Sequence, residues 1–109
     1  MDRLTRFYTQ PVVVERYVGR TTKGPTYAAQ VTELGKVRPE ARLVTTSDGR
    51  EVTTIATIQF SSTIAAIPAE SRITLPAKFG GRRGKVAAES LHDAGIGLAY
   101  YEIHVEGGA

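Results

Sequence analysis

Cysteine and asparagine are both missing from the 109-residue sequence. Without cysteine the chain forms no disulfide framework, has no thiol nucleophile and binds no metal through thiolates. Without asparagine it has no acceptor for N-glycosylation. The two histidines would need carboxylates beside them to complete a zinc site. These absences exclude disulfide-stabilised scaffolds and thiol-dependent enzymes.

Long apolar runs are also missing. No stretch approaches the roughly 20 residues that a helix needs to cross a bilayer. The charged start MDRLTRFYTQP is not followed by the apolar segment of a signal peptide. We therefore expect a soluble protein that is made inside the cell and has no membrane partner.

The composition favours a single, mainly β domain. A chain of 109 residues has the length of one domain. Valine, isoleucine and threonine together number 30, against six leucines, and β-branched side chains suit a pleated strand better than a helix. The net charge is +3, from 14 basic and 11 acidic residues, which is less than expected of a protein that coats nucleic acid.

Alternation of apolar and polar residues predicts short strands separated by turns. The expected strands cover residues 11–19, 26–34, 42–46, 51–60, 72–75, 85–91 and 98–106. Between two of them Ser47-Asp48-Gly49 predicts a hairpin turn, because glycine tolerates a positive φ and aspartate caps the turn. A short helix is possible only within residues 61–71. The pattern is typical of a small antiparallel β-barrel or sandwich of six to seven strands with at most one short helix.

The domain organisation follows from the same pattern. Residues 1–10 form a polar N-terminal arm, residues 11–106 a single β-barrel domain, and residues 107–109 a flexible tail. In the first strand Val12, Val14 and Val18 share one face, which Arg16 interrupts unless its long stem reaches solvent. Residues 19–25 read as a loop, and residues 35–41 interrupt the strands around Pro39.

The glycine-rich basic segment at residues 77–84 invites comparison with a phosphate-binding loop. Only three residues separate Gly80 from Gly84, where the Walker pattern needs four, and Val86 occupies the place of its serine or threonine. The residues that follow are extended rather than helical. We interpret the segment as a solvated loop, or as one that contacts nucleic acid or an acidic partner.

Catalytic chemistry has no support in the sequence. His92-Asp93 reads as a turn in which the aspartate binds local backbone, and His104 faces away from the apolar side of its strand. No serine lies in a nucleophile-elbow pattern. We expect no catalytic residue, no cofactor and no metal.

Single-stranded nucleic acid binders combine a basic groove with stacking aromatic side chains. Of the eight aromatic residues only Phe79 lies among basic residues, and Phe60 and Tyr101 read as core. Binding of single-stranded nucleic acid by a β-barrel module therefore stays an alternative, as does the role of an enzyme accessory subunit.

The order of motifs along the chain is more informative than any one of them. A polar arm precedes PVVVERYVGRTTKGPTYA at residues 11–28, and SDGREV follows at residues 47–52. The later segments are AIPAESRITLP, KVAAESLHD and YYEIHV. In this order and spacing the chain resembles the head-to-tail stopper, or head completion, proteins of long-tailed bacteriophages.

The resemblance implies a small β-barrel without enzymatic activity or cofactor. Such proteins form a sixfold or twelvefold ring below the portal and its adaptor ring. The ring closes the exit channel of the packaged double-stranded DNA and offers the docking surface for the tail terminator and tail proteins. The expected location is the neck of the virion, after synthesis in the host cytoplasm. A neighbouring ring, such as the tail terminator or the adaptor, is the alternative within this class.

Three groups of residues are candidates for contacts within such a ring. A channel-facing loop would use basic side chains to meet DNA phosphates, namely Lys78, Arg82, Arg83 and Lys85. The alternative gating loop comprises Arg42, Ser47, Asp48, Gly49 and Arg50. The N-terminal arm would order against an adaptor subunit through Arg3, Leu4, Arg6, Phe7 and Tyr8.

Overall fold

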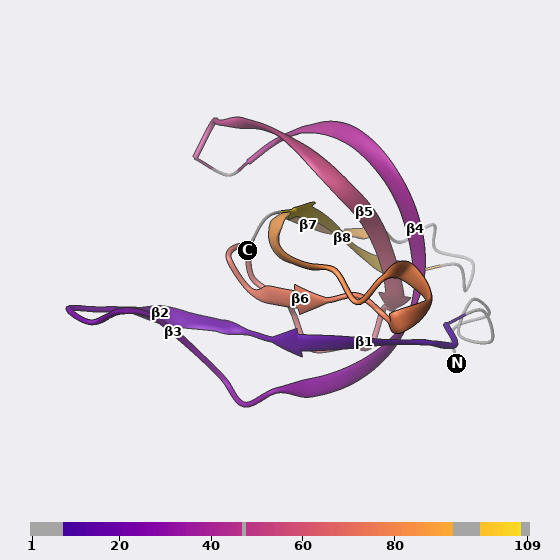
Figure 1. The fold of residues 1–109 in the computed structure, drawn as a ribbon, viewed down its shortest axis with the longest axis horizontal. Coiled ribbons are helices and arrows are strands. Elements are labelled where there is room, and N and C mark those ends of the chain that lie inside the picture. Colours follow the sequence, from indigo (N-terminus) through magenta and orange to yellow (C-terminus); the bar gives the residue numbers. More distant parts are fainter. Residues whose placement is uncertain (1–7, 47, 93–98, 108–109) are drawn as a thin grey trace.

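The fold is a closed antiparallel barrel of six strands (Figure 1). The computed structural model describes residues 8–46, 48–92 and 99–107. Its strands are β1 (Gln10–Glu15), β2 (Tyr17–Thr21), β3 (Gly24–Tyr27), β4 (Val31–Thr45), β5 (Glu51–Ser61), β6 (Arg72–Thr74), β7 (Arg83–His92) and β8 (Tyr100–Gly107). The barrel order is β1-β4-β5-β8-β7-β6, and β6 pairs with β1 to close it. The prediction of a mainly β barrel is confirmed.

The core fills the barrel with aliphatic side chains and one phenylalanine. Val12 and Val14 from β1 are fully buried, as the alternation predicted. Ile58 and Phe60 from β5 and Ile103 from β8 meet them inside the barrel, and Tyr101 and Val105 complete the inner face of β8. Each such side chain contributes about 1.5–3 kcal/mol by leaving water.

Strand β4 is one continuous strand, so the expected interruption at residues 35–41 is wrong. Gly35 lies inside the strand, where a Cβ would be 2.9 Å from the ring of Phe60, so the close approach of this ring requires glycine. The register of β4 against β5 shifts between Pro39 and Arg42, and a bulge of this kind accommodates a proline without a lost ladder hydrogen bond. Glycine and proline here mark close packing and a bulge rather than a loop.

The first expected strand is divided at Arg16. Val18 is 68% exposed and leaves the apolar face that Val12 and Val14 form. Arg16 is not directed to solvent: its guanidinium donates to the backbone oxygens of Ala66 (2.9 Å) and Ala65 (3.0 Å) and pairs with Glu33 (2.8 Å). The pairing within the barrel ends at this arginine, and the chain continues into a separate hairpin.

That hairpin occupies much of the expected loop at residues 19–25. Strands β2 and β3 pair only with each other, and a turn at Thr22 and Lys23 joins them. The expected strand at residues 26–34 is correspondingly divided between β3 and β4. Figure 1 shows this hairpin and the tip of the β4–β5 hairpin reaching beyond the same end of the barrel.

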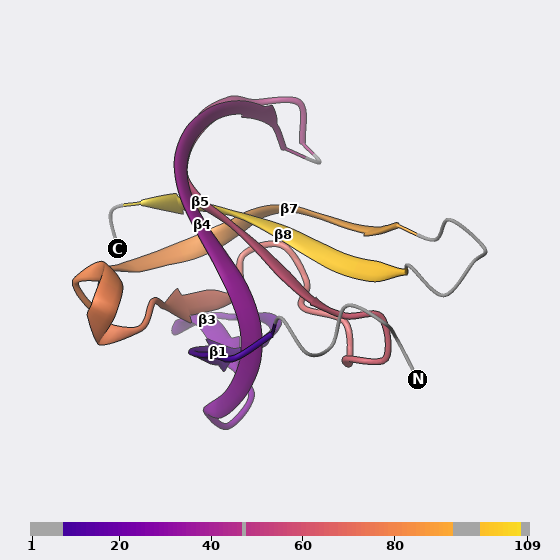
Figure 2. The same cartoon turned by 90° about the vertical axis from the view of Figure 1, so that its right-hand side faces the viewer.

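No helix forms at residues 61–71. The segment makes turns and inserts Ile67, which is fully buried, into the barrel. The one helical element of the described residues is the 3-10 turn η2 (Ala77–Phe79), after Pro76. Figure 2 shows η2 at one end of β7 and the segment at residues 62–70 beside the far end of β8.

The boundaries of the domain differ from those expected. Gln10 already belongs to β1 and Tyr8 is only 5% exposed, so the expected arm overlaps the folded domain at these two residues. At the other end Gly107, the first residue of the expected tail, ends β8. Some predictions concern residues outside the described ranges, namely Arg3, Leu4, Arg6, Phe7, Ser47, Asp93 and the tail at 108–109.

Candidate functional site

The basic loop is a compact turn between β6 and β7. The N–H groups of Phe79 and Gly81 donate to the backbone oxygen of Pro76 at 2.8 and 3.2 Å. Gly80 and Gly81 have φ angles of 84° and 60°, which glycine adopts without steric cost. The Leu75 N–H donates to the Arg82 oxygen at 2.8 Å and closes the turn.

Lys85 belongs to a row of charged side chains that crosses four neighbouring strands. The sheet register places Glu15 beside Arg72, Arg72 beside Lys85, and Lys85 beside Glu106. Arg72 binds Glu15 at 2.6 Å, and Lys85 binds Glu106 at 3.2 Å. Lys85 also reaches Glu70 at 3.3 Å. These carboxylates, Glu106 first, raise the pKa of Lys85.

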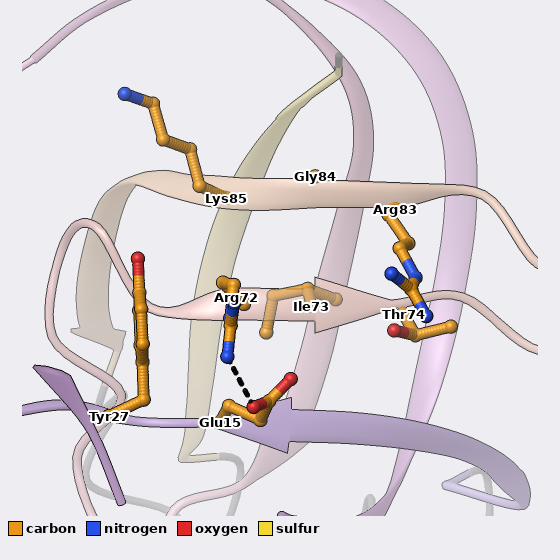
Figure 3. Close-up of a pocket in the computed structure, with 8 residues that line it drawn as sticks. All are labelled: Glu15, Tyr27, Arg72, Ile73, Thr74, Arg83, Gly84 and Lys85. Atoms are coloured by element: carbon orange, nitrogen blue, oxygen red, sulfur yellow. Dashed lines mark hydrogen bonds and ion pairs between the residues drawn. The ribbon is translucent and has the colours of Figure 1, made fainter. Parts of the chain in front are cut away.

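A hollow of about 380 Å³ opens over this row (Figure 3). Arg72 stacks on the face of Tyr27, with its guanidinium carbon 4.0 Å from the ring centroid. Arg83 and Thr74 line one end and Tyr27 the other, while Lys85 extends away from Arg72 (Figure 3). Arg72 and Tyr27 did not stand out in the sequence, because only strand register brings them to the basic loop.

The four cations predicted for the channel-facing loop therefore differ in their surroundings. Lys85 is neutralised by two carboxylates. Lys78, Arg82 and Arg83 form no ion pair within the described part of the chain, and the Lys78 ammonium lies 5.6 Å from the centroid of the Phe79 ring. Net positive charge thus remains on three of the four side chains.

Phe79 is not available as a stacking platform. It packs, partly buried, against the hydrophobic core. Tyr27, the other aromatic residue close to basic side chains, already has Arg72 over its face and Tyr17 at its edge, with 6.0 Å between the two tyrosine centroids. Both rings are committed to contacts within the chain.

The predicted turn at Asp48 and Gly49 is the tip of the β4–β5 hairpin, and this segment is the candidate for the alternative gating loop. Its turn is closed by the Thr46 N–H bound to the Arg50 oxygen at 2.7 Å, and Gly49 has a φ of 86°. Asp48 accepts a hydrogen bond from the Thr46 hydroxyl and pairs with Arg50 at 3.2 Å. The Thr46 bond, followed by Arg50, lowers the pKa of Asp48.

Charge at this tip is balanced, in contrast to the basic loop. Arg42 lies 3.4 Å from Glu40, and Arg50 pairs with Asp48. Ser47 is outside the described residues. The structure thus keeps the two candidate loops apart, one at the β6–β7 turn and the other on the projecting hairpin.

A polar cluster lies on the outer face of β5, β7 and β8. Glu102 is 3.0 Å from the Nε2 of His92 and 3.7 Å from the Nε2 of His104, and the Nδ1 of His104 contacts the Thr57 hydroxyl at 3.1 Å. Burial lowers the pKa of His104 more than the Glu102 charge raises it. No group of three histidine, aspartate or glutamate side chains in the described residues could hold a metal ion.

Comparison with known protein families, with curated proteins and with solved structures found no match to this chain. Within residues 8–46, 48–92 and 99–107 there is no helix long and apolar enough to cross a membrane. The class that fold and surface define is a closed six-stranded antiparallel barrel with two projecting hairpins and a basic turn.

Proposed function

We propose that this chain is a structural protein of the head-to-tail connector of long-tailed bacteriophages, and within it the head-to-tail stopper. It forms a ring that closes the DNA exit channel below the portal and adaptor rings. The same ring offers the docking surface for the tail, and its place is the virion neck. Besides the order of sequence motifs, one structural observation supports this proposal.

That observation is the pair of hairpins that extend from one end of a closed barrel (Figure 1). Residues 51–53 of β5, between the hairpin tip and Thr54, pair only with β4. Strands β2 and β3 pair only with each other. A two-stranded hairpin is marginally stable in water and offers unpaired edges. Assembly into a ring would cover such edges by contacts between neighbouring subunits.

The three cations of the β6–β7 turn would face the DNA. Lys78, Arg82 and Arg83 carry charge that no carboxylate of the described residues neutralises. Repetition around a ring multiplies this charge, and phosphates are bound by it without sequence preference. Lys85 has a structural role in the row of charges instead.

The adaptor-contacting arm is shorter than the sequence suggested. Tyr8 is only 5% exposed, so its side chain does not offer an exposed surface to an adaptor subunit. The proposal for the arm therefore rests on Arg3, Leu4, Arg6 and Phe7. A neighbouring ring such as the tail terminator stays the alternative within this class.

Electron microscopy tests the proposed function. The purified chain is added to portal–adaptor complexes of the phage whose genes surround its own, and particles are imaged in negative stain with and without it. We expect an extra ring of density below the adaptor. Failure to bind these complexes, or a gene neighbourhood without portal and tail genes, would count against the proposal.

Binding of single-stranded nucleic acid is the competing function. Fluorescence anisotropy with a labelled 20-mer at low and physiological salt distinguishes the two. We expect binding that disappears at physiological salt, because Phe79 and Tyr27 are engaged within the chain and charge alone remains.

A further inference from the structure

The β2–β3 hairpin carries an exposed apolar side chain between cations. Val18 is 68% exposed, the largest such value among the exposed large apolar residues of the described chain. Arg20 and Lys23 follow it, and no acidic residue occurs between Arg16 and Glu33. Neither Arg20 nor Lys23 has a carboxylate partner within the described residues.

A second hollow has the complementary chemistry. It measures about 440 Å³ and lies between the end of β4, the segment before β6, and β7. Its lining is mostly small, consisting of Thr45, Thr46, Pro68, Ala69, Ala87, Ala88 and Glu89. Glu89 is exposed and contacts the neutral Tyr101 hydroxyl, but no cation in the part of the chain that the structure describes.

We propose that the β2–β3 hairpin of one copy docks into the hollow beside Glu89 of a second copy. Val18 packs against Ala69 and Ala88, and the cations Arg20 and Lys23 approach the carboxylate of Glu89. Because the two surfaces differ, the contact is heterologous and repeats from copy to copy until the assembly closes. This inference rests on the proposed ring and names the surfaces that build it.

The choice of a second copy as occupant follows from charge. The hairpin carries two cations and no acidic residue, and the hollow joins a lining of small residues to the carboxylate of Glu89. Both surfaces are uncovered within one copy, since Val18 is exposed and the hollow is open. Opposite charges on the two surfaces also disfavour pairing of two hairpins or of two hollows, and so set the direction of assembly.

Single cysteines test the contact directly, because the chain has none of its own. Val18→Cys and Ala88→Cys proteins are mixed, oxidised and run on a non-reducing gel, both in solution at high concentration and after addition to portal–adaptor complexes. Leu34→Cys, exposed on β4, replaces Ala88→Cys as the matched control. We expect a heterodimer band for Val18→Cys with Ala88→Cys well above that control.

A charge reversal supplies the second measurement. Lys23→Glu, made in the Val18→Cys protein, is expected to lower cross-linking by about fivefold, as befits an exposed ion pair. Lys36→Glu, on the exposed outer side of β4, should leave it unchanged. Equal effects of the two reversals would show that general charge, not this contact, drives association.

The outcomes separate this inference from the proposed function. A ring on the connector without the specific cross-link overturns the hairpin contact and leaves the connector role intact. A specific cross-link in solution, without binding to the connector, supports the contact and overturns the connector role. Absence of both overturns both.

Discussion

The hydroxyl of Tyr101 holds the backbone of Ile67 at both of its polar groups. The Ile67 N–H donates to the hydroxyl at 2.9 Å, and the Ile67 oxygen lies 3.1 Å from it as an acceptor. The Glu89 carboxylate is a second acceptor for the same hydroxyl proton. One side chain of β8 thus fixes the segment that inserts Ile67 into the barrel.

Tyr101→Phe tests this relationship. The substitution leaves the buried Ile67 N–H without its acceptor, so we expect a loss of about 1–3 kcal/mol in the free energy of unfolding. Urea denaturation followed by circular dichroism measures it. Tyr100→Phe, next to it and half-buried, serves as the control and should change stability by less than about 0.5 kcal/mol. Equal losses in the two variants would refute the special role of the Tyr101 hydroxyl.

Gly84 is required by close packing between β7 and β8. A Cβ at this position would lie 2.3 Å from the backbone oxygen of Glu106 and 2.7 Å from a methyl group of Val105. Gly84→Ala should therefore cost about 1–3 kcal/mol or more, because backbone cannot move aside as a flexible side chain does. At Gly19 a Cβ meets nothing within 4 Å, so Gly19→Ala should be neutral or slightly stabilising. Thermal denaturation of both variants provides the comparison.

Stability should depend on pH through His104. Burial makes the folded-state pKa of His104 lower than its ordinary value of 6.5, so the folded chain binds this proton less readily than the unfolded chain. The contribution of neutral His104 to the free energy of unfolding is complete above pH 6.5 and is lost as the pH falls towards the folded-state pKa. The groups that act on it are Glu102, Arg42, Glu40 and His92.

Denaturation midpoints between about pH 8 and pH 5 in wild type and His104→Gln measure this effect. The wild type should lose more stability on acidification than the variant does. His92→Gln retains His104 and should keep most of the wild-type pH dependence, because burial is the largest cause of the lowered pKa of His104 and His92 is the smallest. If all three proteins show the same pH dependence, His104 is not its source.

The proposed connector role predicts that retention of packaged DNA depends on the β6–β7 turn. Arg82→Glu combined with Arg83→Glu leaves every ion pair within the described residues intact, so assembly should persist while filled heads lose their DNA. The corresponding reversal at Arg42 and Arg50 changes the other candidate loop and also removes the ion pairs with Glu40 and Asp48. Quantification of DNA in purified heads compares them, and leakage only in the Arg42 and Arg50 variant would transfer the gate to the β4–β5 hairpin.

Much of the fold could be predicted where alternation is regular. The faces of β5 and β8 followed from residues such as Ile58 and Ile103, whose apolar side chains repeat every second position. The hairpin turn at Asp48 and Gly49 followed from the steric freedom of glycine. Prediction failed where a residue that usually interrupts strands is needed for close packing. Gly35 makes room for Phe60, and alternation along one strand does not reveal this contact between two strands.

The candidate site was only partly visible in the sequence. The cluster of cations at residues 78–85 lies within one short segment and was recognised in the sequence. The sequence did not show that Lys85 is neutralised while the other three cations keep their charge. Glu106 and Glu70 neutralise Lys85 because strand register and a loop bring them there from distant positions. Arg16 likewise read as a flaw in an apolar face, and its role in holding Ala65 and Ala66 depends on a segment 49 and 50 residues away.

The sequence by itself determined the strand-rich class, the absence of cysteine chemistry and the position of the basic turn, because these depend on composition and local steric preference. The tertiary structure decided which cations keep their charge and which hairpins leave the barrel. Pairing between distant strands sets both, since an ion pair or an open edge exists only relative to a neighbour that local sequence does not specify.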